Sequence, residues 1–182
     1  MAAESARVFF ALWPPAALAD NLADFAGQLA QTCGGKPTRA DTVHLTLAFV
    51  GDIDASRLPE LAAAARGLAV TPFTLTLDRL GYWPHNRIVW AGCSAPPAGL
   101  GELAATLREQ VMAAGFAVDR GKTGFFPHVT LLRKVTQAPP ASALERPLGW
   151  RCQGFVLVRS QLSASGSHYR LVQYYPFLAP LA

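Results

Sequence analysis

The 182-residue chain has few of the side chains that bind metals or form cross-links. It has three cysteines, Cys33, Cys93 and Cys152, which are far apart and form no Cys-x-x-Cys motif, and it has four histidines. Such a set is typical of reduced thiols in a cytosolic protein, not of a disulfide framework or a zinc site. The carboxylates are not clustered either, so a zinc or two-metal hydrolase would lack its ligands. We therefore expect no metal, no cofactor and a cytoplasmic location.

The signatures of several large enzyme classes are also missing. No G-x-x-x-x-G-K-[ST] or G-x-G-x-x-G occurs, so neither a P-loop nucleotidase nor a dinucleotide-binding fold is indicated. The serines of "SASGS" lack the G-x-S-x-G context of a serine hydrolase. Long apolar runs are absent: the run from Val8 to Trp13 stops at Pro14, and Glu4 precedes it. We predict neither a signal peptide nor a membrane span.

What is present is the composition of an ordinary globular chain, with 51% hydrophobic and 15% charged residues. That is enough to bury a core, and it argues against disorder. The formal net charge of +4 leans mildly towards anionic partners. Four cations, namely Arg120, Lys122, Arg133 and Lys134, surround the second of the two motifs described next. A basic patch beside a site suits a phosphate-bearing ligand, and the alternative is a solvated charged face.

A histidine and a threonine two positions apart occur twice, in "HLTLAFVGD" from His44 and in "HVTLLRKV" from His128. Side chains alternate along a strand, so His44 and Thr46 share one face, as do His128 and Thr130. The residues expected to face the core are Leu45, Leu47 and Phe49 in the first strand and Val129 and Leu131 in the second. One such motif would indicate little, since a lone histidine is more often a core or capping residue. Two copies indicate a site.

The rest of the chain repeats in step with these motifs. Residues 7–11 match residues 87–91 at an offset of 80, and the Pro-Pro pairs at 14–15 and 96–97 match at an offset of 82. The His-x-Thr motifs follow at an offset of 84. Offsets that grow by small insertions are what two copies of one unit would leave.

Each copy predicts a strand, a helix that begins after Pro-Pro, and the His-x-Thr strand. The helices should end before Gly34-Gly35 and at Gly115. Their apolar stripes are Leu18, Leu22, Phe25 and Leu29 in the first and Leu100, Leu103, Leu107 and Val111 in the second. The remaining predictions are a helix at about 56–68, strands at 73–80, 155–162 and 169–177, and a Pro-rich surface loop at 137–147.

These elements predict an α+β protein, a single bilobal domain over residues 1–182 built on an internal duplication. The copies span about 7–51 and about 87–135, and C-terminal strands at 155–177 complete the chain. We expect two pseudo-symmetric lobes, each a mostly antiparallel sheet backed by helices. The active-site cleft should lie between the lobes, where the two motifs face each other.

Two imidazoles and two hydroxyls in one cleft suit acid–base hydrolysis of a phosphodiester. Imidazole titrates near pH 6.5, so one ring can be neutral and deprotonate water while the other ring, protonated, donates a proton to the leaving oxygen. Threonine hydroxyls can donate to the phosphoryl oxygens. Neither a metal nor a covalent nucleophile is needed. The other two histidines, His85 and His168, are expected in a turn and a solvated loop.

Five stretches of the chain, "RVFFALWPP", "HLTLAFVGD", "FTLTLDRLGYW", "RIVWAG" and "FFPHVTLLR", closely resemble the bacterial RNA 2′,3′-cyclic phosphodiesterases, also called 2′-5′ RNA ligases. These belong to the 2H phosphoesterase superfamily. The resemblance covers nearly the whole chain and weakens after about residue 135. It implies metal-independent hydrolysis of RNA 2′,3′-cyclic phosphates to 2′-phosphate ends. It also implies that His44 is the proton donor to the 3′ oxygen, that His128 is the proton acceptor, and that Thr46 and Thr130 bind the phosphoryl oxygens.

Some assignments stay open at this point. Strict alternation turns Arg133 away from His128, so it is a substrate contact only if the strand ends or twists before it; otherwise it is a solvated arginine. Phe9, Trp13 or Phe126 could stack a base, although each is more readily explained as core. The same site could instead perform 2′-5′ ligation or hydrolyse a cyclic nucleotide, and a non-catalytic RNA-binding module is the alternative of a different class. The expected partner is an RNA or oligonucleotide with a 2′,3′-cyclic phosphate end, bound by a monomer and not at a membrane.

Overall fold

A computed structural model of the chain describes residues 4–119, 124–140, 142–163 and 166–178. Two of the four expected patch cations, Arg120 and Lys122, lie outside the described residues. The strands are β1 (Ser5–Leu12), β2 (Lys36–Pro37), β3 (Leu45–Asp54), β4 (Phe73–Trp83), β5 (Ile88–Gly92), β6 (His128–Arg133), β7 (Ala143–Cys152), β8 (Gly154–Ser163) and β9 (Gly166–Pro176). The helices are α1 (Ala16–Cys33), α2 (Leu58–Ala64) and α3 (Ala98–Ala113), with short 3₁₀ turns at Ala40–Thr42 and Ala55–Arg57.

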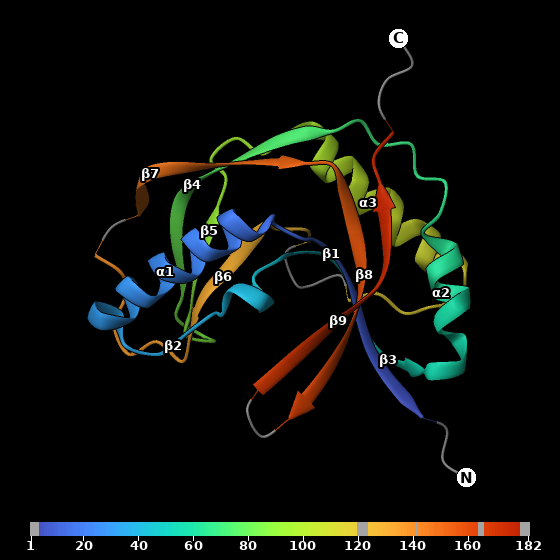
Figure 1. The fold of residues 1–182 in the computed structure, drawn as a ribbon, viewed down its shortest axis with the longest axis horizontal. Helices are drawn as coiled ribbons and strands as arrows, with labels where there is room; N and C mark the ends of the chain where they lie inside the picture. Colours follow the sequence, from blue (N-terminus) through green and yellow to red (C-terminus); the bar gives the residue numbers. More distant parts are fainter. Residues whose placement is uncertain (1–3, 120–123, 141, 164–165, 179–182) are drawn as a thin grey trace.

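The strands of the described residues form one sheet in the order β7-β4-β5-β6-β3-β1-β8-β9, with β2 added alongside β6. Their pairings are antiparallel. Between β6 and β3 the pairing narrows to a single position, Leu45 with Val129. The sheet therefore divides there into the two lobes that Figure 1 shows on the left and right. The predicted α+β architecture with two antiparallel lobes is confirmed.

Each of the two long helices, α1 and α3, crosses over: it follows a strand of one lobe and packs against the other lobe. The chain leaves β1 in the right-hand lobe, yet α1 contacts β6 and β2 in the left-hand one; α3 follows β5 but contacts β3 (Figure 1). Apolar side chains of both helices and both lobes consequently share one continuous core, which includes Leu22 of α1, Leu107 of α3, Leu45 and Leu131. A shared core resists opening of the two lobes, because separating them would expose that apolar surface to water.

The strands that carry the motifs each contain a β-bulge one residue after the threonine. In the pairing of β3 with β1, Phe10 lies opposite Ala48 and Ala11 opposite Thr46, which leaves Leu47 without a partner. The pairing of β6 with β5 skips Leu131 in the same way. A bulge adds one residue to a strand, so the alternation of faces is reset after it.

The bulges change which residues are buried. Leu47 and its neighbour Ala48 are both inaccessible to solvent, as are Leu131 and Leu132. Phe49 was predicted to face this core, and that prediction is wrong. It packs instead in a smaller cluster on the opposite face with Phe9, under the guanidinium of Arg7 at 5.1 Å from the ring centre. The equivalent position in the second motif strand is Arg133.

Other sequence predictions need smaller corrections. α2 is shorter than the expected 56–68, because the chain turns after Ala64 and Gly67 adopts a φ of 77°. The expected surface loop at 137–147 contains the start of strand β7, which the sequence pattern did not reveal. Pro147 and Gly149 hide it, and both are tolerated there because β7 is an edge strand. α1 does end before Gly34, as predicted, and α3 ends two residues before Gly115.

Two further expectations concern the thiols and the membrane. Cys33, Cys93 and Cys152 are all free, as predicted. None of the helices in the described part of the chain combines the length and apolarity that a membrane crossing requires.

Candidate active site

The two His-x-Thr motifs meet at the junction of the lobes. Leu45 and Val129, the middle residues of the motifs, pair directly, and both side chains are fully buried. Residues on either side of them in each strand face the other way. Because the pairing is antiparallel, each histidine lies across from the threonine of the other motif. We call these four side chains the His-Thr quartet: His44, Thr46, His128 and Thr130.

Both imidazole rings are held in the same manner by their own backbone. Nδ1 of His44 lies 2.7 Å from the carbonyl oxygen of Thr42, and Nδ1 of His128 lies 2.8 Å from that of Phe126. A carbonyl oxygen only accepts, so Nδ1 carries the hydrogen in each ring and donates it. The tautomer assigned in this way leaves Nε2 of each neutral ring with a lone pair. Each histidine thus presents one nitrogen for proton exchange.

The surroundings lower the pKa of both rings. Burial is the main cause for His44 and brings its pKa from 6.5 to about 4; the hydrogen bond to Thr42 partly opposes this, and the charges of Arg133 and His128 reinforce it. Burial also lowers the pKa of His128, with the bond to Phe126 opposing and Arg133 reinforcing. Both rings are therefore neutral at pH 7 in the ligand-free protein. The expectation that one ring is neutral and the other protonated during catalysis stays a prediction.

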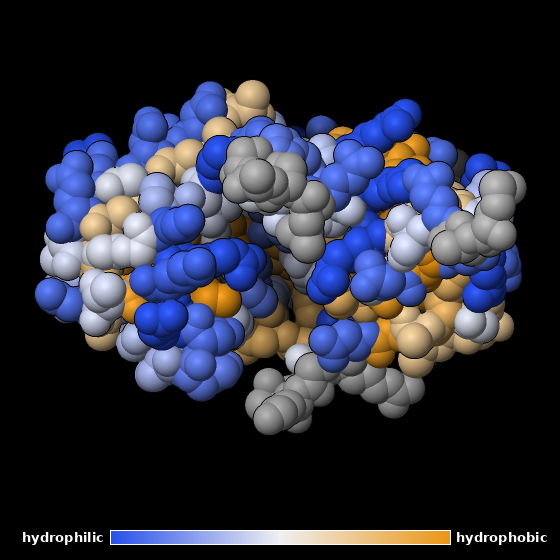
Figure 2. Space-filling model, turned by 90° about the horizontal axis from the view of Figure 1, so that it is seen from below, coloured by the Kyte–Doolittle hydropathy of each residue, from blue (hydrophilic) through white to orange (hydrophobic). Residues whose placement is uncertain are grey.

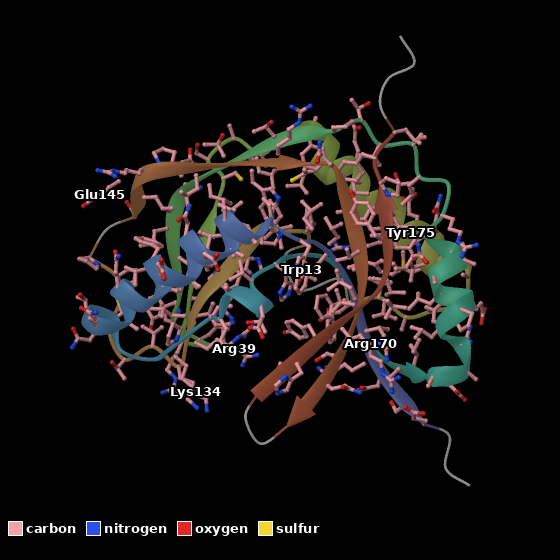
Figure 3. The ribbon with its side chains drawn as sticks, in the orientation of Figure 1. Trp13, Arg39, Lys134, Glu145, Arg170 and Tyr175 are labelled. Atoms are coloured by element: carbon pink, nitrogen blue, oxygen red, sulfur yellow. The ribbon has the colours of Figure 1, made fainter. Side chains whose placement is uncertain are left out.

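Aromatic side chains enclose His44. Its ring stacks on Trp13, with centroids 5.8 Å apart and planes 10° from parallel, and contacts Phe9 at 4.8 Å and Tyr169 edge-on at 5.3 Å. Trp13 lies between the lobes in Figure 3. Phe9 is buried as expected, but in the small cluster on the face of the quartet and not in the main core. These rings supply the desolvation that lowers the pKa of His44.

A different aromatic group flanks His128. Trp83 meets its ring edge-on at 4.6 Å, and Phe126 lies at 6.2 Å. Phe126 was expected in the core, yet it is 43% exposed. The structure explains this: Phe126 precedes the strand and meets the rings of Trp83 and Trp90 edge-on, with centroids 5.8 and 4.9 Å apart. The two histidines thus make the same kind of hydrogen bond to the backbone but have different aromatic neighbours.

A cavity of about 360 Å³ opens on the side of His44 and Thr130. Its lining includes Arg133 and Lys134 from the end of β6, whereas Thr46 and His128 are not part of the lining. Further lining residues are Lys36, Thr38, Arg39, Thr42, Ser167 and Tyr169. Figure 2 shows a hollow between the two halves of the molecule with hydrophilic residues on both sides. Figure 3 shows Arg39 and Lys134 beside the left-hand lobe, on the side that faces β9.

Arg133 reaches this cavity because of the bulge at Leu131. Strict alternation would have placed it with Val129, away from His128. The extra residue turns it to the face of the quartet, where its charge lowers the pKa of both histidines. The condition set by the sequence, that the strand be interrupted before Arg133, is met.

The remaining candidates lie outside the site. His85 is exposed in the turn between β4 and β5, as predicted. His168 is exposed, also as predicted, but lies on β9 and not in a loop. Sequence reasoning missed Lys36, Arg39 and Tyr169. Lys36 lies on β2, which pairs with β6, Arg39 precedes the 3₁₀ turn at Ala40–Thr42, and Tyr169 lies on β9, which pairs with β8; no local sequence signal shows that these segments meet at the site. Among the described residues, no group of three or more His, Cys, Asp or Glu side chains is placed to hold a metal ion.

Comparison with known proteins places this geometry in a family. The model of the LigT-like phosphoesterases matches residues 12–90. An RNA 2′,3′-cyclic phosphodiesterase of Escherichia coli K12 is 39% identical over 136 residues, which cover 74% of this chain and 76% of that protein. One of Thermus thermophilus is 30% identical over 175 residues, covering 92% of this chain and 88% of that protein.

Solved structures agree with the sequence relatives. E. coli LigT in complex with 3′-AMP superposes with a TM-score of 0.86 at 32% identity, covering 96% of this chain and 99% of that one. TT0787 of T. thermophilus gives a TM-score of 0.81 at 29% identity, with 96% and 100% coverage. The chain therefore belongs to the LigT-like phosphoesterases, the family of these RNA 2′,3′-cyclic phosphodiesterases.

Proposed function

We propose that this chain hydrolyses RNA 2′,3′-cyclic phosphodiester ends to 2′-phosphomonoester ends by two-histidine acid–base catalysis, without a metal ion. The observation that carries the proposal is the His-Thr quartet, in which two rings with the same tautomer flank one strand junction. The names of the E. coli and T. thermophilus relatives support the substrate class. The three free thiols suit a reducing compartment and support a cytoplasmic location.

In the proposed reaction, Nε2 of His128 accepts a proton from a water molecule whose oxygen attacks phosphorus. The bond from phosphorus to the 3′ oxygen breaks, and that oxygen takes a proton from Nε2 of His44. The products are a 2′-phosphomonoester and a free 3′ hydroxyl, with His128 protonated and His44 neutral. Exchange of protons with solvent restores the starting state. Each proton transfer is of the kind that contributes about 10² to 10⁴ in rate.

His44 must be protonated to act as the donor, although its pKa is about 4 in the free protein. A bound phosphodiester carries a negative charge, and an anion beside an imidazole favours the imidazolium form. It also offsets the charge of Arg133, one of the groups that lower the pKa. We propose that His44 takes up its proton together with the substrate. Binding and protonation are then coupled, which gives the pH dependence considered in the Discussion.

The unequal surroundings of the two rings support the direction of the reaction. In-line displacement requires the attacking water and the leaving oxygen on opposite sides of phosphorus. The leaving 3′ oxygen carries the ribose and the rest of the RNA, which need space, whereas a water molecule needs little. The cavity lies on the side of His44, and His128 is flanked by Trp83 and Phe126. His44 is therefore better placed as the acid, and His128 as the base.

The remaining members of the site are proposed to hold the phosphoryl group. The hydroxyls of Thr46 and Thr130 lie on the face of the two imidazoles and can donate to the non-bridging oxygens as charge develops on them. Arg133 is proposed as a further contact, since its guanidinium lines the same cavity and offers charge-assisted hydrogen bonds. A backbone fixed by two paired strands keeps these donors in place before substrate arrives.

One assay tests the proposal against its alternatives. Purified protein is given 2′,3′-cyclic AMP, a short RNA with a 2′,3′-cyclic phosphate end, and the same RNA with an added 5′-hydroxyl RNA. Formation of phosphomonoester ends supports hydrolysis. Stoichiometric binding of the RNA without turnover would replace the proposal with a non-catalytic module. A 2′-5′ linked product as the main species would replace it with ligation.

A further inference from the structure

Two lysines flank Arg133 at the mouth of the cavity. Lys36 pairs with Arg133 across β2 and β6, and Lys134 follows Arg133 in the chain. Both are exposed, and both line the same cavity as His44 and Thr130. We call them the lysine rim.

The backbone around the lysine rim adopts conformations that most residues avoid. Gly35 has a φ of 89°, and a Cβ on it would lie 2.6 Å from the carbonyl oxygen of Arg133. Only glycine lets the two segments approach so closely. Lys134 has a φ of 58°, which is uncommon for a residue with a side chain and costs about 1 kcal/mol or more. The two lysines are thus brought to either side of Arg133 by specific features of the chain.

The part of the chain that the structure describes offers the lysine rim no ion-pair partner: none of its ion pairs involves Lys36 or Lys134. Arg39, on the same cavity, differs: it contacts both carboxylate oxygens of Asp41, at 2.9 and 3.2 Å, and donates to the backbone oxygen of Ser167 at 3.1 Å. Arg39 therefore joins the two sides of the cavity mouth, while the lysine rim is left for an anion from outside.

The size of the cavity indicates which anion. The cavity that His44 and Thr130 line has a volume of about 360 Å³, at the lower end of the range for sites that enclose a small ligand. That volume suits the terminal nucleoside. The next negative charge along an RNA chain is the phosphate on the 5′ side of that nucleoside. We infer that Lys36 and Lys134 bind this phosphate, so that the site selects RNA ends over free nucleoside 2′,3′-cyclic phosphates.

This inference rests on the proposed function, and its test separates the two. The kcat/KM is measured for three substrates: 2′,3′-cyclic AMP, the same compound with a 5′-phosphate, and the dinucleotide ApA with a 2′,3′-cyclic phosphate end. The variant is Lys36→Gln with Lys134→Gln. Its control is Arg146→Gln with Arg151→Gln, which removes the same charge from exposed positions on the edge strand β7, separated from β6 by β4 and β5.

We expect the wild type to prefer both phosphate-bearing substrates over 2′,3′-cyclic AMP by about three- to thirtyfold, the range for one or two exposed charge-assisted contacts. The lysine variant should lose most of this preference, whereas the arginine control should keep it. The inference is overturned if the wild type shows no preference, if the lysine variant retains it, or if both variants lose it equally, since that would mean attraction by net charge alone. Failure of the wild type to hydrolyse any of the three would instead overturn the proposed function.

Discussion

Leu45 and Val129 face each other at the single position where β3 of one lobe pairs with β6 of the other. Because this pair is central to both motifs, it determines which side chains meet on the opposite face. A slip of one residue in either strand would turn a histidine and a threonine into the core and bring leucines to the surface. The full burial of both side chains makes such a slip costly. The site is thus set by the packing beneath it.

The first prediction concerns the two rings. His44→Ala and His128→Ala should each lower kcat by at least about 10²-fold, because each removes one proton-transfer group. His85→Ala is the matched control, since His85 is exposed in a turn, and it should leave kcat unchanged. Circular dichroism checks that the fold is retained. The two-histidine mechanism is abandoned if either site variant keeps more than a tenth of the wild-type kcat.

The second prediction concerns the pH dependence of catalysis. The proposed base, His128, must be neutral and the proposed acid, His44, protonated, so kcat/KM should be bell-shaped, with both limbs belonging to the coupled pair. Both pKa values are lowered in the free protein, so this bell should lie below pH 6.5. In the complex, the bound anion raises the pKa of His44, so the falling limb of kcat should lie at higher pH than the falling limb of kcat/KM. A rate that climbs steadily to pH 10 would exclude His44 as the donor.

The third prediction concerns stability and follows from burial of His44. Its pKa is about 4 when folded and near 6.5 when unfolded, so the unfolded chain binds the proton more tightly. This ring therefore contributes stability that is present above pH 6.5 and is lost as the pH falls towards 4. The full effect is on the order of 3 kcal/mol. The free energy of unfolding is measured in urea at pH 7 and at pH 4.5. It should fall less between these two pH values for His44→Gln than for the wild type; an equal fall would mean that the pKa of His44 is not lowered.

The fourth prediction concerns metals. The four histidines and scattered carboxylates provide no ligand set in the sequence, so a millimolar excess of EDTA should leave the rate of cyclic phosphate hydrolysis unchanged. The control is the same assay with added zinc or manganese. Loss of activity on chelation with recovery on adding either metal would require a metal-dependent site.

Period-two alternation and a repeated motif both bear on the same four residues, so the sequence alone indicated that each His-Thr pair shares a face, and the pairing of Leu45 with Val129 brings the two pairs together. It could not predict the bulges at Leu47 and Leu131. Nothing local distinguishes a bulged leucine from a regular one, since the bulge arises from pairing with a distant strand. For that reason Phe49 was assigned to the wrong face, and the position of Arg133 stayed open until the strand pairing was known.

Long-range pairing explains the other differences as well. The sequence match aligned residues 7–11 with 87–91 at an offset of 80, but the strand registers make Ala11 the counterpart of Trp90, an offset of 79. The alignment by residue similarity did not take account of the face of the sheet on which each residue lies. Edge strand β7 was missed because Pro147 resembles a loop residue. The lowered pKa values depend on aromatic rings from β1, β4 and β9 and on Trp13 after β1, which no single segment reveals.

The most direct measurement identifies the product of a single hydrolysis. A short RNA with a 2′,3′-cyclic phosphate end is hydrolysed by the wild-type protein, and ³¹P NMR compares the product with authentic 2′- and 3′-phosphate standards. With His128 as base and His44 as acid, in-line attack breaks the bond to the 3′ oxygen, so the account predicts the 2′-phosphate as the main product. A mainly 3′-phosphate product would contradict it, because the sugar would then bind with the acid and the base exchanged.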